Sequence, residues 1–499
     1  MLPAQPTWAS KAGEGVLKLR VVDKATGQVI PCRIHLKNQA NVSRKTYGLP
    51  FWFDHIICPG EIDMKLPKGG YTFVIERGPE YVDVTGHFQI NDYSEDEKTV
   101  ELKRAVDMAA ESWWAGDMHI CRPLREIELA MQAEDLHVAG LVTWDNKKTH
   151  WAKEPLPTET TFKFDNDRYY HLLTGKDARA GGTLLLFGLP RPLGLTGMAR
   201  DFPPSLDVVG MAKQSNPNVW IDVEKPYWWD LPLWLAAGAV DSIELLNSHM
   251  LRGGMTKNEA WGKTRDRSRY PDPLGNGYWS EAVYHQVLNA GFRIPPSAGS
   301  GSGEANNPVG YNRVYVWSPK DGFDADAWWA GLKAGRCIVT NGPLIRPIAN
   351  SQLPGHVFRV KPGEEFTVEV ALNMATRDPI AYVEVVENGR VAQSVRMEIL
   401  AKTGRFPPLK ITKPGWFLVR AVTQNEETYR MASSGPWYVE YEDQPPRVSR
   451  AAAQMFLNWV QERAAMIRIE DAEQKAAAMR YIDGARIFWE KRLAGANAP

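Results

Sequence analysis

Three side chains that can bind a metal or move a proton alternate along one short segment, Asp117-Met118-His119-Ile120-Cys121. Alternate residues of a β-strand face the same side, so we expect Asp117, His119 and Cys121 to project together. A carboxylate, an imidazole and a thiolate are competent ligands for zinc or a similar ion. Alternatively, His119 is a general base that Asp117 orients, or it hydrogen-bonds within a polar core. The neighbouring acid and thiol favour a functional site.

Two more apolar segments end in groups of the same chemical kind. Asp222 and Glu224 are two residues apart in WIDVEKP, where a proline must end the strand. Glu244 lies inside VDSIELLNSHM, and a carboxylate in such apolar surroundings needs a partner or a cation. Asn247 and His249 follow at the exit of that segment. An internal ion pair explains Asp222 and Glu224 equally well, whereas we expect His249 to belong to a site.

The elements that must position these groups lie between residues 105 and 345. Apolar β-type segments alternate there with helical ones, and several, such as TLLLFG, are apolar almost throughout, as buried parallel strands are. One helix, EAVYHQVLNA, is expected to begin at Ser280 as its cap. This alternation predicts a parallel βα barrel or a wound sheet, in which chemistry takes place at the C-terminal ends of the strands.

Regions of a different type flank this part, so the predicted fold class is multidomain, α/β plus all-β. Residues 1–104 contain apparent hairpins, VLKLRVVD with VIPCRIHL and IDMKLP with YTFVIE, and predict a β-sandwich. Residues 346–445 predict a second β-sandwich, with Asn388-Gly389 as a hairpin turn. Residues 446–499 carry apolar stripes at helical spacing and predict a helical tail that covers the chain's own domains.

Composition excludes two classes of partner. Among 499 residues, Lys plus Arg and Asp plus Glu both number 59, so the formal net charge is zero. That balance gives no electrostatic argument for binding nucleic acid. No apolar run approaches the ~20 residues that span a bilayer, so we expect no membrane insertion. The sequence leaves the oligomeric state open.

The four cysteines do not form a CxxC pair. Cys32 and Cys58 both lie in the first β-rich region, where they either form a disulfide in an exported protein or remain buried free thiols. By analogy with other barrels that carry β-modules, we expect a periplasmic or extracellular protein, although the first residues contain no signal-peptide core.

The segments GDMHICRP, SIELLN and PSAGSGSG, taken together, resemble the PHP (polymerase and histidinol phosphatase) superfamily of metallohydrolases. The likeness spans about residues 113–343 and is closest to the carbaryl-hydrolase-like CehA/McbA branch. It implies a distorted, TIM-like βα barrel that binds up to three divalent metals. It also implies hydrolysis of ester, amide or phosphoester bonds.

The chain departs from that family's pattern at most of the metal ligands. The opening His-x-His ends in a cysteine at residues 119–121, and Thr-Asp-His is Thr-Trp-Asp at 143–145. A later His-Pro is Lys-Pro at 225–226, and the closing Gly-Ser-Asp-x-His is Gly-Ser-Gly-Ser-Gly at 299–303. The resemblance therefore implies at most one ion, Zn or Mn. Its implied ligands are His119, Glu224 and His249, with Cys121 as a substitute. The other outcome is a metal-free barrel that has lost the chemistry.

Three functions follow from these observations. The first is a metal-dependent hydrolase of a small neutral molecule, an ester, amide or glycoside, with Asp117 and Glu244 as catalytic residues. The second is a catalytically silent protein that binds a carbohydrate or another small molecule, because thirteen tryptophans lie between residues 113 and 329. The third and weaker one is a metal-free acid–base lyase that uses Asp117, Asp222 and Glu224. The residues expected to contact substrate are Trp144, Asn146, Asp222, Asn247 and Arg313.

Overall fold

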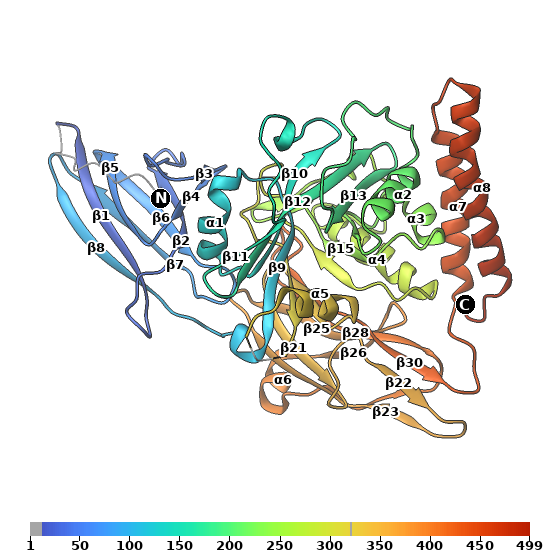
Figure 1. Ribbon diagram of the computed structural model, residues 1–499. Coiled ribbons are helices and arrows are strands. Elements are labelled where there is room, and N and C mark those ends of the chain that lie inside the picture. Colours follow the sequence, from blue (N-terminus) through green and yellow to red (C-terminus); the bar gives the residue numbers. More distant parts are fainter. Residues whose placement is uncertain (1–11, 320–321) are drawn as a thin grey trace.

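The computed structural model describes residues 12–319 and 322–499, and it has several small sheets, one large mixed sheet and two long C-terminal helices. Figure 1 shows the N-terminal β-region on one side of the central region and the two C-terminal helices on the other. The first eleven residues, where no signal-peptide core was expected, lie outside the described part. None of the described helices is long and apolar enough to cross a membrane.

Two sheets that share one apolar core make up the N-terminal β-region. The first sheet has the order β5 (Glu61–Pro67), β1 (Glu14–Asp23), β8 (Glu95–Leu102). The second has the order β3 (Phe51–Trp52), β4 (His55–Cys58), β2 (Cys32–Asn38), β6 (Gly69–Glu76), β7 (Val84–Ile90). Both expected hairpins are wrong, because β1 and β2 belong to different sheets, as do β5 and β6. Alternating polarity is the same in a hairpin and in two strands that pack face to face, so the pattern did not distinguish them.

Cys32 and Cys58 oppose each other in the register of β2 and β4, and both thiols are free and buried.

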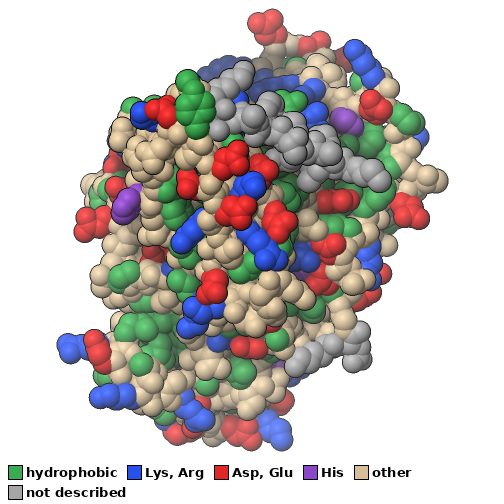
Figure 2. Space-filling view, turned by 90° about the vertical axis from the view of Figure 1, so that its left-hand side faces the viewer, with side chains coloured by type: hydrophobic (Ala, Val, Ile, Leu, Met, Phe, Trp, Pro, Cys, Tyr) green, Lys and Arg blue, Asp and Glu red, His purple; other side chains and the backbone are tan. Residues whose placement is uncertain are grey.

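Charged side chains of both signs interleave on the outer face of the N-terminal β-region, onto which Figure 2 looks. Exposed residues of β1 pair across the sheet, with Lys18 Nζ 3.0 Å from Glu97 and Arg20 Nε 2.9 Å from Glu61. Exposed pairs of this kind each contribute about 0–1 kcal/mol to stability. In each pair an acidic and a basic side chain neutralise each other.

The central region is organised on the large mixed sheet. Its strands lie in the order β18 (Pro296–Ala298), β15 (Ser242–Leu246), β14 (Trp220–Val223), β13 (Gly182–Phe187), β12 (Arg168–Arg179), β10 (Val138–Asp145), β9 (Trp113–Ile120), β19 (Arg313–Trp317), β20 (Cys337–Thr340). An edge strand, β11 (Thr161–Phe164), pairs with β12. The expectation of a parallel sheet is wrong in part: β9, β10 and β12 are parallel, as are β14, β15 and β18, whereas β13 and β19 run antiparallel to their neighbours.

The sheet curls back on itself just after β18. Ser302 forms a parallel bridge with Ile120 at the end of β9. The N–H of Gly301 donates to the carbonyl of His119 at 2.8 Å, and the N–H of Cys121 donates to the carbonyl of Ser302 at 2.7 Å. The ends of β9, β14, β15 and β18 therefore meet around one interior.

Helices cover the outside of this sheet, namely α1 (Ile127–Glu134), α2 (Ser205–Ser215), α3 (Leu231–Ala236), α4 (Gly275–Asn289) and α5 (Ala325–Lys333). The expected start of α4 at Ser280 is wrong, since the helix begins at Gly275. Ser280 is fully buried inside the helix, and its hydroxyl accepts a hydrogen bond from Asn247 Nδ2 at 3.1 Å. Ser280 therefore hydrogen-bonds to a residue at the interior end of β15 and does not cap a helix.

The second β-rich region continues the large sheet. Strand β20 pairs with β29 (Met431–Ser434), which is followed by β28 (Gly415–Thr423), β25 (Ile380–Glu387) and β26 (Arg390–Val395). Asn388-Gly389 does form the turn between β25 and β26, with φ of 51° and 81°. The remaining elements of this region are β21 (Leu344–Ala349), β22 (Val357–Val360), β23 (Phe366–Val368), β24 (Val370–Ala375), α6 (Met397–Thr403), β27 (Leu409–Ile411) and β30 (Trp437–Tyr441). Hydrogen bonds between strands therefore cross the expected boundary at residue 345.

The tail forms two helices, α7 (Arg450–Met466) and α8 (Ala472–Ala494), that pack on each other and on α3. The indole of Trp489 is buried and donates to the carbonyl of Pro232 at 3.0 Å. The guanidinium of Arg463 donates to Asp230 at 2.7 Å and to Asp201 at 2.9 Å. The apolar stripes thus cover the chain's own central region.

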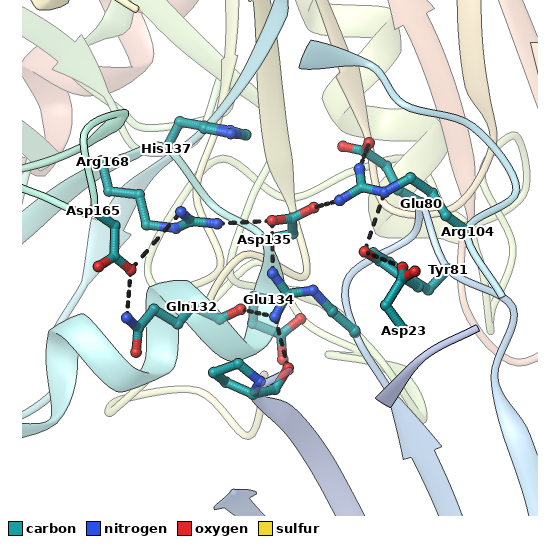
Figure 3. A network of polar contacts seen from close by, with 12 residues as sticks. Asp23, Glu80, Tyr81, Arg104, Gln132, Glu134, Asp135, His137, Asp165 and Arg168 are labelled. Carbon is teal, nitrogen blue, oxygen red and sulfur yellow. Dashed lines mark hydrogen bonds and ion pairs between the residues drawn. The ribbon is translucent and has the colours of Figure 1, made fainter. Parts of the chain in front are cut away.

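One carboxylate fastens the N-terminal β-region to the central region. Asp135, at the centre of Figure 3, ends α1 in a left-handed conformation and accepts hydrogen bonds from three arginines. Arg77 donates at 3.0 Å, Arg104 at 2.8 Å and Arg168 at 2.8 Å. Burial alone would raise the pKa of Asp135, but the guanidinium groups hold its pKa below the usual range. Arg77 and Arg104 come from the N-terminal β-region and its exit, so this network fixes that region against α1.

Candidate functional site

His119 lies at the end of β9 with its imidazole fully buried. Among the described residues, neither ring nitrogen has a hydrogen-bond partner. Nδ1 is 3.6 Å from Glu224 Oε1, and Nε2 is 3.8 Å from Glu304 Oε2. Burial lowers the pKa of His119 to about 4 against the opposing effect of Glu224. The ring is therefore neutral at neutral pH and lies between two carboxylates without bonding to either.

Each of these carboxylates holds a lysine. Lys225 Nζ lies 2.5 Å from Glu224 Oε1, which also accepts a hydrogen bond from Ser248 Oγ at 3.1 Å. Lys176, a buried residue of β12, forms an ion pair with Glu304. Burial opposes the charge of Glu224, but Lys225, His119 and Lys176 hold its pKa well below the usual range. We call Lys176, Glu224, Lys225 and Glu304 the charged quartet.

A cavity of about 400 Å³ lies over the charged quartet and is also lined by Trp228, Trp261, Ser248 and His249. The two indoles stack, with ring centroids 4.8 Å apart and planes inclined by 27°. Lys225 Nζ lies 4.8 Å from the centroid of Trp228. Trp228 is fully buried, whereas Trp261 is 42% exposed and offers an aromatic surface at the cavity edge.

His249 and Asn247 support the cavity wall. His249 Nδ1 is hydrogen-bonded to the hydroxyl of Tyr227 at 2.7 Å, and burial, followed by Lys225, holds the His249 pKa well below its usual range. Asn247 accepts from the N–H of His249 at 3.1 Å and donates to Ser280. Asn247 is therefore a positioning residue that lies behind the cavity wall.

Cys121 faces a second, smaller cavity of about 280 Å³ together with Trp144 and Glu304. Ligand atoms of His119, Cys121 and Glu304 all lie within 4.8 Å of one another. Burial raises the pKa of the Cys121 thiol, so the sulfur is protonated at neutral pH. Trp144 itself is buried and donates from Nε1 to the carbonyl of Leu173 at 3.0 Å.

Asp117 holds the loop after β18 in place. It accepts hydrogen bonds from the N–H groups of His119 and Ser300, each at 3.0 Å, from the N–H of Gly310 at 2.7 Å and from the Ser300 hydroxyl. Burial raises the Asp117 pKa to about 6 in spite of these bonds. These hydrogen bonds tie the carboxylate to the backbone and to Ser300, and Asp117 does not line the 400 Å³ cavity.

Asp222 and Glu244 lie deeper in the same interior. Asp222 accepts from Ser242 Oγ at 2.5 Å and Ser297 Oγ at 2.6 Å, and burial raises its pKa to about 7. Glu244 has no hydrogen-bond partner for either oxygen among the described residues, and burial raises its pKa well above the usual range. A Cβ at Gly299 would lie 2.2 Å from Glu244 Oε1 and 2.5 Å from His119 Cβ. The absence of a side chain there lets Glu244 and His119 approach the same loop.

Two of the expected substrate contacts are used elsewhere. Asn146 donates to Asp177 at 2.8 Å and accepts from the N–H of Ala178 at 2.6 Å, next to the cavity wall. Arg313 donates to the carbonyl of Glu134 at 3.1 Å, and it lines a different cavity, between the two β-rich regions and the central region. Arg313 therefore does not join the site around His119.

Sequence reasoning missed Lys176, Glu304 and the particular pair Trp228 and Trp261. Lys176 stands among other polar residues of β12, in TGKDAR, so nothing in the local sequence distinguishes it from an exposed lysine. Glu304 follows a glycine-rich loop, and nothing in the local sequence indicates that this loop folds back onto β9. The stacking of Trp228 on Trp261 is likewise a contact between distant segments.

The residues present do not fit a divalent metal of the kind that the family resemblance implies. Both carboxylates beside His119 are already neutralised by lysine ammonium groups. Gly301 and Gly303 have φ of +62° and +101°, a conformation that disfavours side chains. A Cβ at Gly303 would lie 2.4 Å from the carbonyl oxygen of Cys121. The loop is thus built for glycine at both positions.

No family model matches the chain, and no curated protein matches it. Among solved structures, it is similar to the Bacillus anthracis TIE protein, with 22% identity and a TM-score of 0.15. That match covers 22% of this chain and 19% of the other, so the chain spans about a fifth of that protein. A likeness this slight says nothing about fold or function.

Proposed function

We propose that this chain is a binding protein for a small polar molecule of the carbohydrate class, built on a PHP-like barrel. The observation that carries the proposal is the stacked pair Trp228 and Trp261 at the edge of a cavity whose floor is the charged quartet. A cavity of about 400 Å³ lies within the usual range for small-molecule sites.

A sugar ring has an apolar face and a rim of hydroxyl groups, and the cavity supplies a partner for each. The exposed ring of Trp261 can stack on the apolar face. Hydroxyl groups need fixed donors and acceptors, and Glu304 and Lys176 provide both in one ion pair. Half of the Glu304 side chain (47%) remains exposed, so its oxygens are accessible to a ligand.

Intrinsic fluorescence and melting temperature, measured against a panel of mono- and disaccharides, test this proposal. For a saccharide that binds, Trp261→Ala should weaken affinity about tenfold, equivalent to ~1.4 kcal/mol. Trp317→Ala is the matched control, because Trp317 is partly buried at the end of β19 and does not line the cavity. A panel that changes neither the fluorescence nor the melting temperature of the wild-type protein contradicts the proposal.

A metal-dependent hydrolase is the second candidate, and one observation favours it. The two ring nitrogens of His119 are buried without a hydrogen-bond partner among the described residues, close to Cys121 and Glu304. His119, Cys121, Glu304 and Glu224 are the side chains nearest to a possible ion, but a zinc or manganese ion would first have to displace a lysine from each carboxylate. The metal content of protein purified without chelators, beside His119→Ala, separates this candidate from the first.

The acid–base lyase has the least support of the three functions. Of its three expected residues, only Glu224 lines the cavity over the charged quartet. Asp117 and Asp222 accept hydrogen bonds from serine hydroxyls and backbone N–H groups of the surrounding loops and strands. Glu224 would have to act with a lysine of the quartet instead.

A further inference from the structure

We infer that the ammonium groups of Lys176 and Lys225 occupy the cation positions of this site, so that the chain works without a metal and acquires metal affinity only when these lysines are removed. The inference rests on the proposed function in one respect, that the cavity over the charged quartet is the binding site. It goes further by assigning the two lysines the place of an inorganic ion.

Two carboxylate oxygens face the imidazole of His119. Each ring nitrogen faces one carboxylate oxygen, at 3.6 Å for Glu224 and 3.8 Å for Glu304. A nitrogen and an oxygen at such a separation are too far apart for a hydrogen bond, and they form the two sides of a space that a cation can share. The oxygen on each side is the very atom that contacts a lysine: Oε1 of Glu224 contacts Lys225, and Oε2 of Glu304 contacts Lys176.

The charges of the quartet already balance one another. The quartet contains two carboxylates and two ammonium groups, so its net charge is zero before any ion is added. Both lysines are buried, with 6% and 4% of their surface exposed. A divalent ion would therefore add two positive charges beside two buried ammonium groups, and no carboxylate of the quartet would be left to compensate them, which is unfavourable.

The loop of residues 299–303, here called the glycine loop, leaves no room for metal-ligating side chains. Residues 299–303 pack along the end of β9 through hydrogen bonds between Gly301 and His119 and between Cys121 and Ser302. This packing requires left-handed backbone at Gly301 and Gly303, and it places Glu304 beside Lys176. The backbone conformation that leaves no room for metal-ligating side chains at residues 301 and 303 thus also positions the Glu304 carboxylate to pair with Lys176.

The two ammonium groups remain available to a ligand. Each ammonium has three N–H donors, and the described contacts of Lys225 use one for Glu224. Lys176 and Lys225 both line the cavity. They can therefore donate hydrogen bonds to ligand oxygens, in the place where a metal ion would coordinate such oxygens. This suits a polyhydroxylated or weakly anionic molecule.

Zinc and manganese binding, measured separately by equilibrium dialysis and calorimetry on the full chain, tests the inference. Wild-type protein should retain less than a tenth of an equivalent of either metal. The double variant Lys176→Met/Lys225→Met should bind about one equivalent at least tenfold more tightly, and His119→Ala added to it should abolish that gain. Lys213→Met, a change of an exposed lysine on α2, is the matched control and should behave as wild type.

Three results would overturn the inference: stoichiometric metal in the wild type, no gain of affinity in a folded double variant, or a gain that His119→Ala does not remove. Should the double variant fail to fold, the single variants Lys176→Gln and Lys225→Gln replace it, with Lys176→Arg and Lys225→Arg as charge-preserving controls that should bind no metal. Saccharide binding by wild type in EDTA separates the two proposals. If no saccharide binds while the metal results are as expected, the proposed function fails and the inference stands.

Discussion

Lys225 and Glu224 are neighbours in the chain, and their side chains meet at the end of β14 with 2.5 Å between Nζ and Oε1. Adjacent residues of an extended strand point to opposite faces, so this contact forms only because the strand ends at Val223 and a proline follows. The ion pair is therefore a consequence of where the strand stops. It places a positive charge beside His119 that the alternation of residues in a strand would have directed elsewhere.

Replacing the interdomain carboxylate, Asp135→Asn, should destabilise the protein by about 3–5 kcal/mol, because three buried or half-buried arginines lose their charged partner. Urea unfolding measures the change. Hydrogen exchange should also show faster exchange at the contact between the N-terminal β-region and α1.

The control for this change is Glu97→Gln, which removes an exposed ion pair with Lys18 and should cost less than ~1 kcal/mol. Equal effects of the two substitutions would mean that Asp135 does not fasten the two regions.

The glycine loop should not tolerate a side chain at Gly303. Its φ is +101°, and a new Cβ would meet backbone atoms of Cys121, so Gly303→Ala should cost about 1–3 kcal/mol and weaken saccharide binding. Gly210→Ala is the matched control, since Gly210 lies in α2 with open space around its Cα. That substitution should stabilise the protein by about 0.5–1 kcal/mol. Thermal unfolding of both variants measures these changes in stability. A Gly303→Ala variant as stable as the wild type would show that position 303 does not require glycine.

Asp222 should make stability depend on pH in a definite direction. Its pKa is raised by burial to about 7 from an ordinary value of 3.8, so the folded state holds a proton that the unfolded state releases. The stabilisation is complete below pH 4 and is lost as pH rises towards 7, with a magnitude of a few kcal/mol.

Asp222→Asn keeps an oxygen for Ser242 and Ser297 but removes the titration. The free energy of unfolding of wild type relative to Asp222→Asn should therefore fall between pH 4 and 7 and then level off. Chemical denaturation at several pH values measures this difference. A difference that does not vary with pH would show that Asp222 titrates normally.

Local patterns predicted the elements that position the site better than they predicted the site itself. The apolar segments that end near residues 119, 224 and 249 are strands or strand exits, and their polar groups do converge. Asp117 does accept a hydrogen bond from His119, but from its backbone N–H and not from the imidazole, so the predicted orientation of the ring by Asp117 is not seen. These features depend on residues that are near one another in the chain.

What local patterns missed depends on contacts between distant segments. Glu304 reaches His119 only because the loop after β18 pairs with β9, and Lys176 reaches Glu304 from β12. The direction of β13 and β19 was likewise hidden, because a fully buried strand has the same apolar composition in either direction. Arg313 has the residue type of a substrate contact, but it is committed to Glu134 on α1.

The pairing of β20 with β29 has a practical consequence for work on the central region. A chain cut at residue 345 would leave one side of β20 with unsatisfied N–H and C=O groups along an apolar strand. Such a strand is a template for aggregation, so the isolated fragment should precipitate or swap strands with another copy. The piece that contains His119 is therefore best studied together with the strands that complete its sheet.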